Sequence, residues 1–160
     1  MISKQDLITL LKKEFSTTLR VLKAYPQEKN DFKPHERSSN VLGLTSTFVF
    51  EMYLLNMHLF GDALDRSIFQ KYRPDNIQTV VNDFERECTQ VIERLEKMQE
   101  SDLSKTVTFA NRTYVADEFA LMMLHDQIHH RGQLSVYVRM AGGKVPSIYG
   151  PSADDPTPNL

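Results

Sequence analysis

The stretch that decides the fold runs from residue 116 to residue 140 and reads ADEFALMMLHDQIHHRGQLSVYVRM. Its apolar residues recur at helical spacing, and Gly142-Gly143 follow it directly, so the pattern predicts a helix over 116–140. Three histidines and one aspartate lie between positions 125 and 130. This helix therefore carries polar side chains that we expect to turn toward the core of the protein.

Three more helices are predicted outward from this segment, over about 3–25, 39–60 and 76–98. The first begins with Ser3 and Asp6, a hydroxyl cap with an acid three residues on, and the second ends at Gly61. Residues 26–37 (PQEKNDFKPHER) are polar and hold two prolines, which indicates a crossover loop. We expect residues 62–75 to be irregular.

The helical spacing of apolar residues stops before the last predicted helix. Residues 105–109 (KTVTF) and 112–115 (RTYV) are rich in β-branched and aromatic residues, which predicts a small hairpin. The predicted fold class is therefore all-α: a four-helix bundle with a long crossover between helices 1 and 2 and a small β-hairpin before helix 4. We expect one domain over residues 1–160, with an ordered coil tail from about 142 to 160.

The composition of the chain argues against several classes of function. The 160 residues are 41% hydrophobic and carry a formal net charge of −2 without a basic block, so we expect no nucleic-acid partner. The only cysteine, Cys88, lies among apolar positions, which favours a buried side chain over a reactive thiol. The chain shows no signal peptide and no apolar run of the ~20 residues that span a bilayer. We expect no membrane partner and a cytoplasmic protein.

Polar residues in the last helix share one face with apolar ones. When a helical wheel is centred on Asp126, His130 and Gln133 lie near the same midline. Seven apolar residues fall within about 80° of it: Val115, Phe119, Met122, Met123, Leu134, Tyr137 and Met140. We therefore expect Asp126, His130 and Gln133 on the buried face, with Arg131 pointing away from the core. We expect His125 at the surface. His129 is expected at the border of the buried face, where it can contact a residue that binds a metal.

The second predicted helix carries a matching line of residues: Asn40, Leu44, Thr47, Glu51, Leu54 and His58. Glu51 on this line can complete a site with Asp126 and His130. His58 is two turns farther along, roughly 10 Å, so we expect it to lie outside that site.

A carboxylate among methionines is costly unless it is paired or binds a metal. An i, i+4 pair on the inner face of a bundle can present two metal ligands. It can equally be a hydrogen-bonded Asp–His pair that fixes the packing of the helix. From periodicity alone both interpretations stay open.

Three segments resemble the DinB-like superfamily: HHRGQL at 129–134, AGGKVPSIYGPSADD at 141–155, and KPHERSS at 33–39 before the second helix. The resemblance implies a four-helix bundle, often dimeric, with a divalent metal held by three histidines, one from helix 2 and two from helix 4. Relatives include thiol-dependent transferases and metal-dependent hydrolases. His130 matches one ligand position, but Asp126 and Thr47 stand where the other two histidines are expected.

This departure leaves two functions open. In the first, the protein is a metal-dependent transferase or hydrolase, with a thiol as one option, that acts on a small molecule through an altered site. His130, Asp126 and Glu51 would hold zinc, nickel or manganese, Glu51 would also serve as a base, and Gln133 would orient the substrate. In the second, the protein is a non-catalytic bundle that has lost its metal site. We expect a homodimer in either case.

Overall fold

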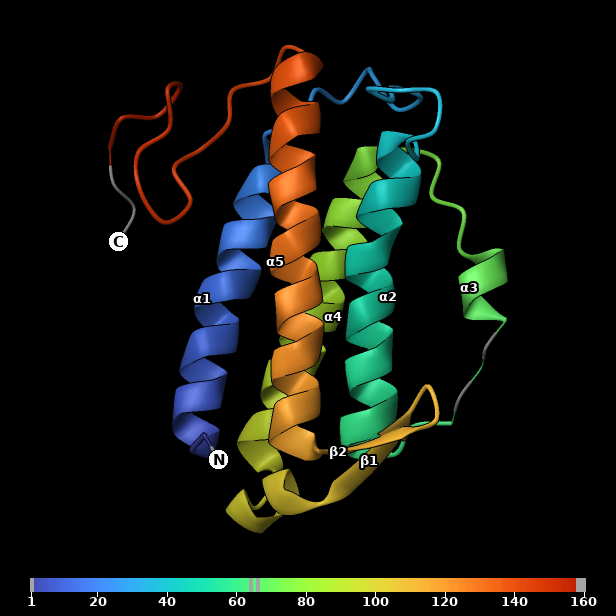
Figure 1. The fold of residues 1–160 in the computed structure, drawn as a ribbon, viewed down its shortest axis with the longest axis vertical. Coiled ribbons are helices and arrows are strands. Elements are labelled where there is room, and N and C mark those ends of the chain that lie inside the picture. The colour runs from blue at the N-terminus through green and yellow to red at the C-terminus, as the bar shows by residue number, and fades with distance from the viewer. Residues whose placement is uncertain (1, 64, 66, 158–160) are drawn as a thin grey trace.

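Four long helices, packed side by side, dominate the computed structural model, which describes residues 2–63, 65 and 67–157 (Figure 1). They are α1 (Lys4–Lys23), α2 (Val41–Phe60), α4 (Ile77–Lys97) and α5 (Ala116–Met140). The shorter elements are α3 (Ile68–Lys71), the 3-10 helix η1 (Glu100–Ser104) and the antiparallel strands β1 (Thr106–Phe109) and β2 (Arg112–Val115). The predicted all-α bundle with a small hairpin before the last helix is confirmed.

Local sequence explains where the helices begin. The Ser3 hydroxyl accepts a hydrogen bond from the Asp6 amide at 3.1 Å, as the sequence predicts. The side chains of Asn40 and Asn76 cap α2 and α4 in the same way, each accepting from a backbone amide at 2.9 Å. These caps satisfy amides that have no partner inside the helix.

Residues with positive φ explain how α2 ends and how the hairpin turns. Gly61 ends α2 in the left-handed conformation with φ 75°, which costs glycine little. The hairpin turns on Ala110 and Asn111, both at positive φ, the backbone that a two-residue hairpin requires.

The order of the helices around the bundle differs from their order along the chain. Helix α1 contacts α4 and α5, and helix α2 contacts the same two, so α1 and α2 lie at opposite corners. Helices α1 and α5 run in one direction, and α2 and α4 in the other (Figure 1). This arrangement needs two long connections, residues 24–40 between α1 and α2 and residues 61–76 back along the bundle to α4.

The second long connection is more regular than expected. The prediction that residues 62–75 are irregular was wrong for Ile68–Lys71, which form α3. The ring centroid of Phe69 lies 5.1 Å from that of Phe50 on α2, and Tyr72 contacts the same ring at 5.7 Å. This aromatic contact holds α3 against the bundle, although the segment is mostly polar.

The buried face of α5 lies about 100° around the helix from the predicted one. Its centre is near Gln127, which is fully buried, whereas the Asp126 side chain is 53% exposed and Met140 is 55% exposed. The prediction that Asp126 and Gln133 lie on the buried midline was therefore wrong. Helix α5 packs against α1 on one side and α2 on the other, so its buried arc lies between those two contacts.

Residues 141–157 follow α5 without helix or strand and pack back onto the bundle. The Asp154 and Asp155 carboxylates accept backbone hydrogen bonds from Val145 and Ser147, which folds this tail on itself. Residues 158–160 of the predicted tail lie outside the described residues. None of the helices in the described part of the chain has the length and hydropathy needed to cross a membrane.

Candidate metal centre

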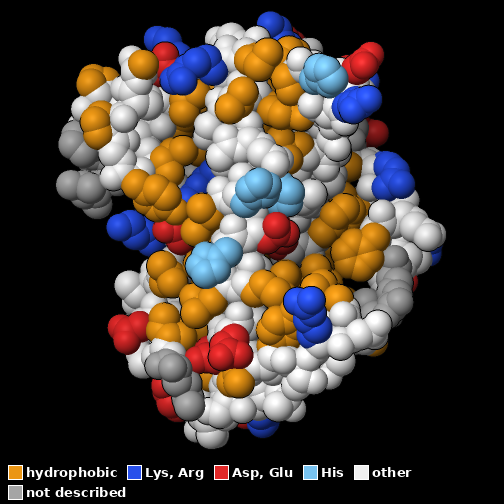
Figure 2. Space-filling view, in the orientation of Figure 1, with side chains coloured by type: hydrophobic (Ala, Val, Ile, Leu, Met, Phe, Trp, Pro, Cys, Tyr) orange, Lys and Arg blue, Asp and Glu red, His pale blue; other side chains and the backbone are white. Residues whose placement is uncertain are grey.

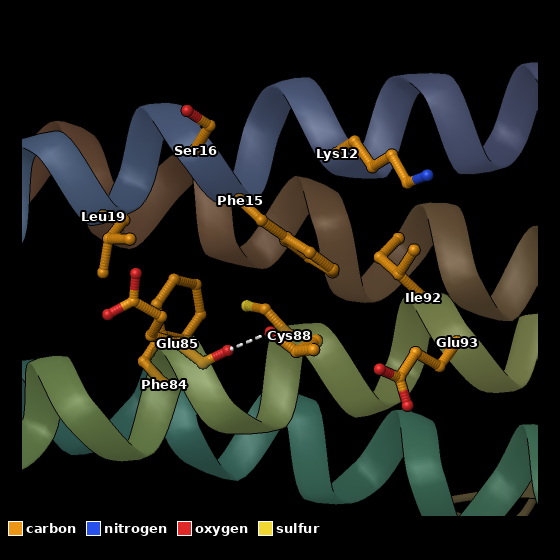
Figure 3. A pocket seen from close by; sticks show the side chains of 10 residues that line it. Lys12, Phe15, Ser16, Leu19, Phe84, Glu85, Cys88, Ile92 and Glu93 are labelled. Carbon is orange, nitrogen blue, oxygen red and sulfur yellow. Dashed lines mark hydrogen bonds between the residues drawn. The ribbon is translucent and has the colours of Figure 1, made fainter.

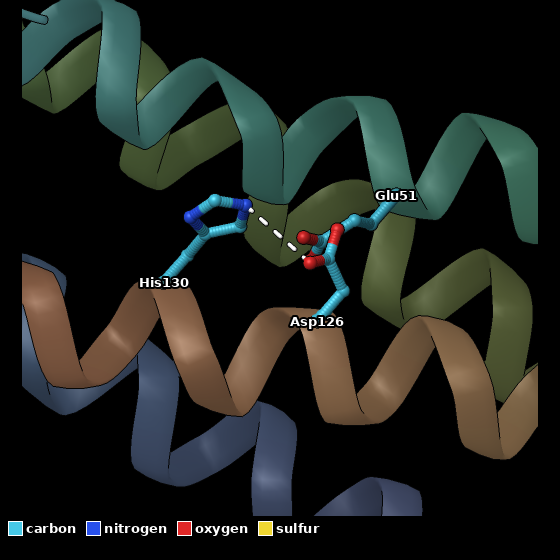
Figure 4. A group of neighbouring side chains, drawn as sticks. All are labelled: Glu51, Asp126 and His130. Atoms are coloured by element: carbon cyan, nitrogen blue, oxygen red, sulfur yellow. Dashed lines mark ion pairs between the residues drawn. The ribbon is translucent and has the colours of Figure 1, made fainter.

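Helices α2 and α5 are antiparallel neighbours, and they bring Glu51 opposite Asp126 and His130 (Figure 4). Each of the three side chains offers one ligand atom, and these atoms lie within 4.8 Å of one another. His130 Nε2 is 3.6 Å from Asp126 Oδ1. The three residues that the sequence predicts as ligands thus form a single group, here named the metal-candidate group.

Glu51 is the buried member of the metal-candidate group. Its side chain is buried, and among the described residues neither carboxylate oxygen has a hydrogen-bond partner. Burial, and then the charge of Asp126, raise the pKa of Glu51 to about 9, while the nearby Gln127 side chain lowers it. At neutral pH the carboxyl therefore holds its proton unless a positive charge replaces it.

Asp126 and His130 connect Glu51 to the surface. The Asp126 side chain is 53% exposed and that of His130 is 21% exposed. Figure 2 shows histidine and acidic side chains gathered at mid-height on the face formed by α5 and α2, between apolar patches. The group is therefore open to solvent on one side and buried at Glu51, so that ions can reach it.

Gln133 contacts both His129 and His130 on α5. The Gln133 amide oxygen is 3.3 Å from His130 Nδ1, and its nitrogen is 2.8 Å from His129 Nε2. An imidazole that donates from Nδ1 keeps its lone pair on Nε2, the nitrogen that faces Asp126. This contact with Gln133 therefore favours the form of His130 that can bind a metal, and the exposed His129 contacts the same amide group.

The remaining predicted residues lie around the metal-candidate group. Thr47 is half-buried one turn before Glu51, and its hydroxyl donates to the Leu44 carbonyl at 2.6 Å. The His58 ring packs on Phe119 at 5.0 Å, outside the group, and burial lowers its pKa. His125 is exposed, as predicted.

A hollow of about 430 Å³ adjoins the metal-candidate group, and His130 lines it. Most of its lining is polar and uncharged: Ser38, Ser39, Gly43, Leu44, Thr47, His130, Gln133 and Tyr137. Its volume falls in the range of small-molecule sites. A ligand in this hollow would lie beside His130.

A second polar cluster, which the sequence did not predict, fills the space between α1 and α5. Arg131 is only 1% exposed, so the prediction that it points away from the core was wrong. Its guanidinium donates to the Glu14 carboxylate at 2.7 Å and to the Tyr149 hydroxyl. These partners, from α1 and the tail, make burial of Arg131 possible. Glu14 gives the one usable signal, because it shares a helical face with Leu7, Leu11 and Thr18.

The groove between α1 and α4 offers no reactive group. It encloses about 310 Å³ and is lined by apolar side chains such as Phe15, Leu19 and Ile92, with Cys88 at its base (Figure 3). Burial raises the pKa of the Cys88 thiol well above its usual value. The prediction that Cys88 is a buried hydrophobic residue is confirmed, and its thiol stays protonated and unreactive.

The fold and the metal-candidate group define a four-helix-bundle protein with a possible metal-binding site. The chain belongs to the DinB family, whose profile matches residues 1–159. It is also 29% identical over 84 residues to the uncharacterized protein YrdA of Bacillus subtilis, an alignment that covers 51% of this chain and 50% of YrdA. The chain thus spans about half the length of that relative.

Solved structures share the fold. A DinB-like protein of Bacillus cereus superimposes with a TM-score of 0.81 at 20% identity, covering 91% of this chain and 97% of that one. The DinB-like protein YjoA of Bacillus subtilis gives 0.68 at 21% identity, covering 86% and 92%. YfiT of Bacillus subtilis, described as a probable metal-dependent hydrolase with an unusual four-helix bundle topology, gives 0.62 at 11% identity, covering 88% and 90%.

Proposed function

We propose that this protein is a divalent-metal-dependent enzyme, a hydrolase or a thiol-dependent transferase, that acts on a small molecule. Glu51, Asp126 and His130 would be the protein ligands of the metal. The carrying observation is the buried Glu51 carboxyl, which has no hydrogen-bond partner among the described residues and lies beside two further ligand side chains.

The three residues fit a divalent cation. Two carboxylates close together repel each other, and a buried carboxylate without partners is costly, so a cation would relieve both penalties. Two oxygens and one imidazole nitrogen suit manganese or zinc. A set of three histidines would suit nickel better than this set does. Three protein ligands leave positions for water or substrate.

A metal bound here would supply Lewis-acid chemistry, polarising a substrate oxygen or lowering the pKa of water or of a thiol. The residues of the chain have separate tasks around it. Gln133, whose amide oxygen is 3.3 Å from His130 Nδ1, would keep the lone pair of His130 on Nε2. Asp126, on the solvent side, is placed to accept a proton from an incoming molecule. Glu51 faces away from solvent, so its role is to hold charge.

The hollow beside His130 indicates the size and polarity of the substrate. Hydroxyl and amide groups line it, and no lysine or arginine is among its lining residues within the described chain. Such a lining suits a small polar molecule without a strongly anionic group. The family resemblance to hydrolases and thiol transferases is compatible with either reaction.

Metal content is the direct test. The protein would be purified without chelator, and its metal measured by elemental analysis beside an Asp126→Ala/His130→Ala variant. We expect near-stoichiometric metal in the wild type and none in the variant. If the wild type holds no metal and takes none up from added manganese, zinc or nickel, this proposal is wrong. If the wild type does bind metal, a panel of small amide and ester substrates, with and without a thiol, would assign the reaction.

Two observations favour a second function, a non-catalytic homodimeric bundle. Thr47 and Asp126 occupy positions where the family resemblance implies histidines, and α5 exposes the apolar side chains of Val136 and Met140. Under this alternative, Asp126→Leu should preserve or raise thermal stability, and a homodimer should form without any metal. Loss of a metal-dependent stabilisation in Asp126→Leu would contradict it.

A further inference from the structure

Gln127 lies in the centre of the bundle, next to the metal-candidate group. Its side chain is fully buried, and its Oε1 accepts a hydrogen bond from the Thr18 hydroxyl at 3.2 Å. Its Nε2 has no hydrogen-bond partner among the described residues, as is true of both Glu51 oxygens. The amide lies close to Glu51, because Gln127 directly follows Asp126 on α5 and the ligand atoms of Asp126 and Glu51 are within 4.8 Å of each other. A buried donor on α5 and a buried acceptor on α2, neither with a hydrogen-bond partner among the described residues, are thus neighbours between these two packed helices.

Hydrogen bonds on the side of Gln127 that faces α1 determine which way its amide points. The Arg131 guanidinium, which can only donate, gives a hydrogen bond to Thr18 Oγ1 at 3.2 Å. The Thr18 hydroxyl therefore has its own hydrogen free to donate to Gln127 Oε1. With the oxygen engaged there, the NH2 end of Gln127 is the end available to Glu51.

An unsatisfied buried amide destabilises the folded protein, and a leucine of similar volume would avoid that cost. A buried glutamine at this position therefore needs a compensating role. A carboxylate that binds a metal through one oxygen still has a second oxygen to satisfy, and hydrogen bonds to it orient the ligand.

We propose that Gln127 is a positioning residue for Glu51, donating from Nε2 to the Glu51 carboxylate when that carboxylate holds the metal. This inference rests on the proposed metal centre. It makes Thr18 and Arg131 indirect supports of the site, through the chain of hydrogen bonds from Arg131 to Thr18 to Gln127. It also predicts that Gln127 improves metal binding without improving the stability of the metal-free protein.

The test compares metal affinity with metal-free stability in the full-length protein. Zinc and manganese are titrated separately into chelator-treated wild type, Gln127→Leu and Thr18→Val by calorimetry. We expect Gln127→Leu to weaken binding about ten- to a hundredfold, and Thr18→Val to weaken it less. The metal-free melting temperature of Gln127→Leu should stay the same or rise. A merely structural role for Gln127 would instead lower the melting temperature and leave affinity unchanged.

Thr45→Val is the matched control for Thr18→Val. Thr45 is also fully buried, but its hydroxyl donates within α2 to the Val41 carbonyl at 2.8 Å. This variant should bind metal with wild-type affinity. If Thr45→Val weakens binding as much as Thr18→Val does, the loss reflects general loosening of the bundle, and the inference is overturned.

A second readout covers the case in which Gln127→Leu does not fold. In wild-type protein, the side-chain amide signals of Gln127 are followed by NMR as zinc is added. A downfield shift that is absent in Glu51→Gln supports the inference, and no shift overturns it. Wild-type protein that binds metal while Gln127→Leu binds equally well overturns this inference alone. Wild-type protein that binds no metal overturns it together with the proposed function.

Discussion

Arg131 on α5 and Glu14 on α1 form an ion pair at 2.7 Å inside the bundle, with side chains only 1% and 6% exposed. Arg131 also donates to the Glu14 carbonyl and the Thr18 hydroxyl, each at 3.2 Å. Tyr149 from the tail donates to the Glu14 carboxylate at 2.9 Å. The pair therefore joins two helices and the tail, and two hydrogen bonds through Thr18 connect it to Gln127.

Removing one partner of this ion pair should be far more harmful than removing both. Arg131→Leu leaves the Glu14 charge buried without compensation, and we expect a loss of about 3–5 kcal/mol in the free energy of unfolding. The double variant Glu14→Leu/Arg131→Leu should recover a large part of that loss. Urea unfolding of the three proteins measures this. A double variant no more stable than Arg131→Leu would show that the buried charge is not the cause.

Tyr149→Phe should loosen the tail. The substitution removes a hydroxyl that contacts both Glu14 and Arg131, so we expect a loss of about 1–3 kcal/mol in the free energy of unfolding. Limited proteolysis should also cut the tail faster. Tyr114→Phe, on the hairpin, is the control, and its change should stay within about 0.5 kcal/mol. Equal effects at the two tyrosines would argue against a specific anchor.

Gly143→Ala should destabilise the turn after α5. A Cβ there would come within 2.7 Å of the Ala24 carbonyl oxygen and 2.9 Å of Val138 Cγ1, so the backbone after α1 would have to move. We expect a loss of about 1–3 kcal/mol, measured by chemical unfolding. Gly150→Ala is the matched control, because a Cβ there meets no atom within 4 Å. A similar loss in both variants would contradict the steric explanation.

The stability of the metal-free protein should fall as pH rises because of Glu51. Its pKa is about 9 in the folded protein, above its value of 4.5 in the unfolded chain, so the folded state binds the proton more tightly. This stabilisation is fully present below pH 4.5, the pKa of Glu51 in the unfolded chain. It is lost as the pH rises toward about 9, and the free energy of unfolding falls by at most about 1.4 kcal/mol per pH unit.

Glu51→Gln removes this titration. Unfolding measured between pH 5 and pH 8 in the presence of chelator should show a flatter stability profile for the variant than for the wild type. Parallel profiles would show that Glu51 ionises normally. The comparison needs no bound metal, so it tests the burial of Glu51 independently of the proposed function.

His130→Ala should abolish metal-dependent stabilisation, whereas His125→Ala should not. A ligand present at a hundred times its dissociation constant stabilises the folded protein by about 2.7 kcal/mol. We expect wild type and His125→Ala to show such a rise in melting temperature with manganese or zinc, because His125 is exposed and outside the metal-candidate group. Wild-type stabilisation retained in His130→Ala would exclude this residue as a ligand.

Local sequence determined the elements of this fold. Caps at Ser3, Asn40 and Asn76, the glycine at 61 and the turn residues Ala110 and Asn111 act on neighbours a few positions away, and helical periodicity is equally local. The same periodicity put Glu51 on one face of α2, and Asp126 and His130 one turn apart on α5. The three residues that the structure brings together were therefore named as candidate ligands without tertiary information.

Only the tertiary structure decided which way α5 faces. This helix carries apolar residues around most of its circumference, including the exposed Val136 and Met140, so its pattern does not define a single buried arc. The arc is set by α1 and α2, which approach from two sides. Arg131 is buried because Glu14, 117 positions away, neutralises it. The periodicity of α1 places Glu14 on a buried face, but nothing in either helix shows that its partner is Arg131. For the same reason, the chain of hydrogen bonds to Gln127 appeared only once the helices were in place.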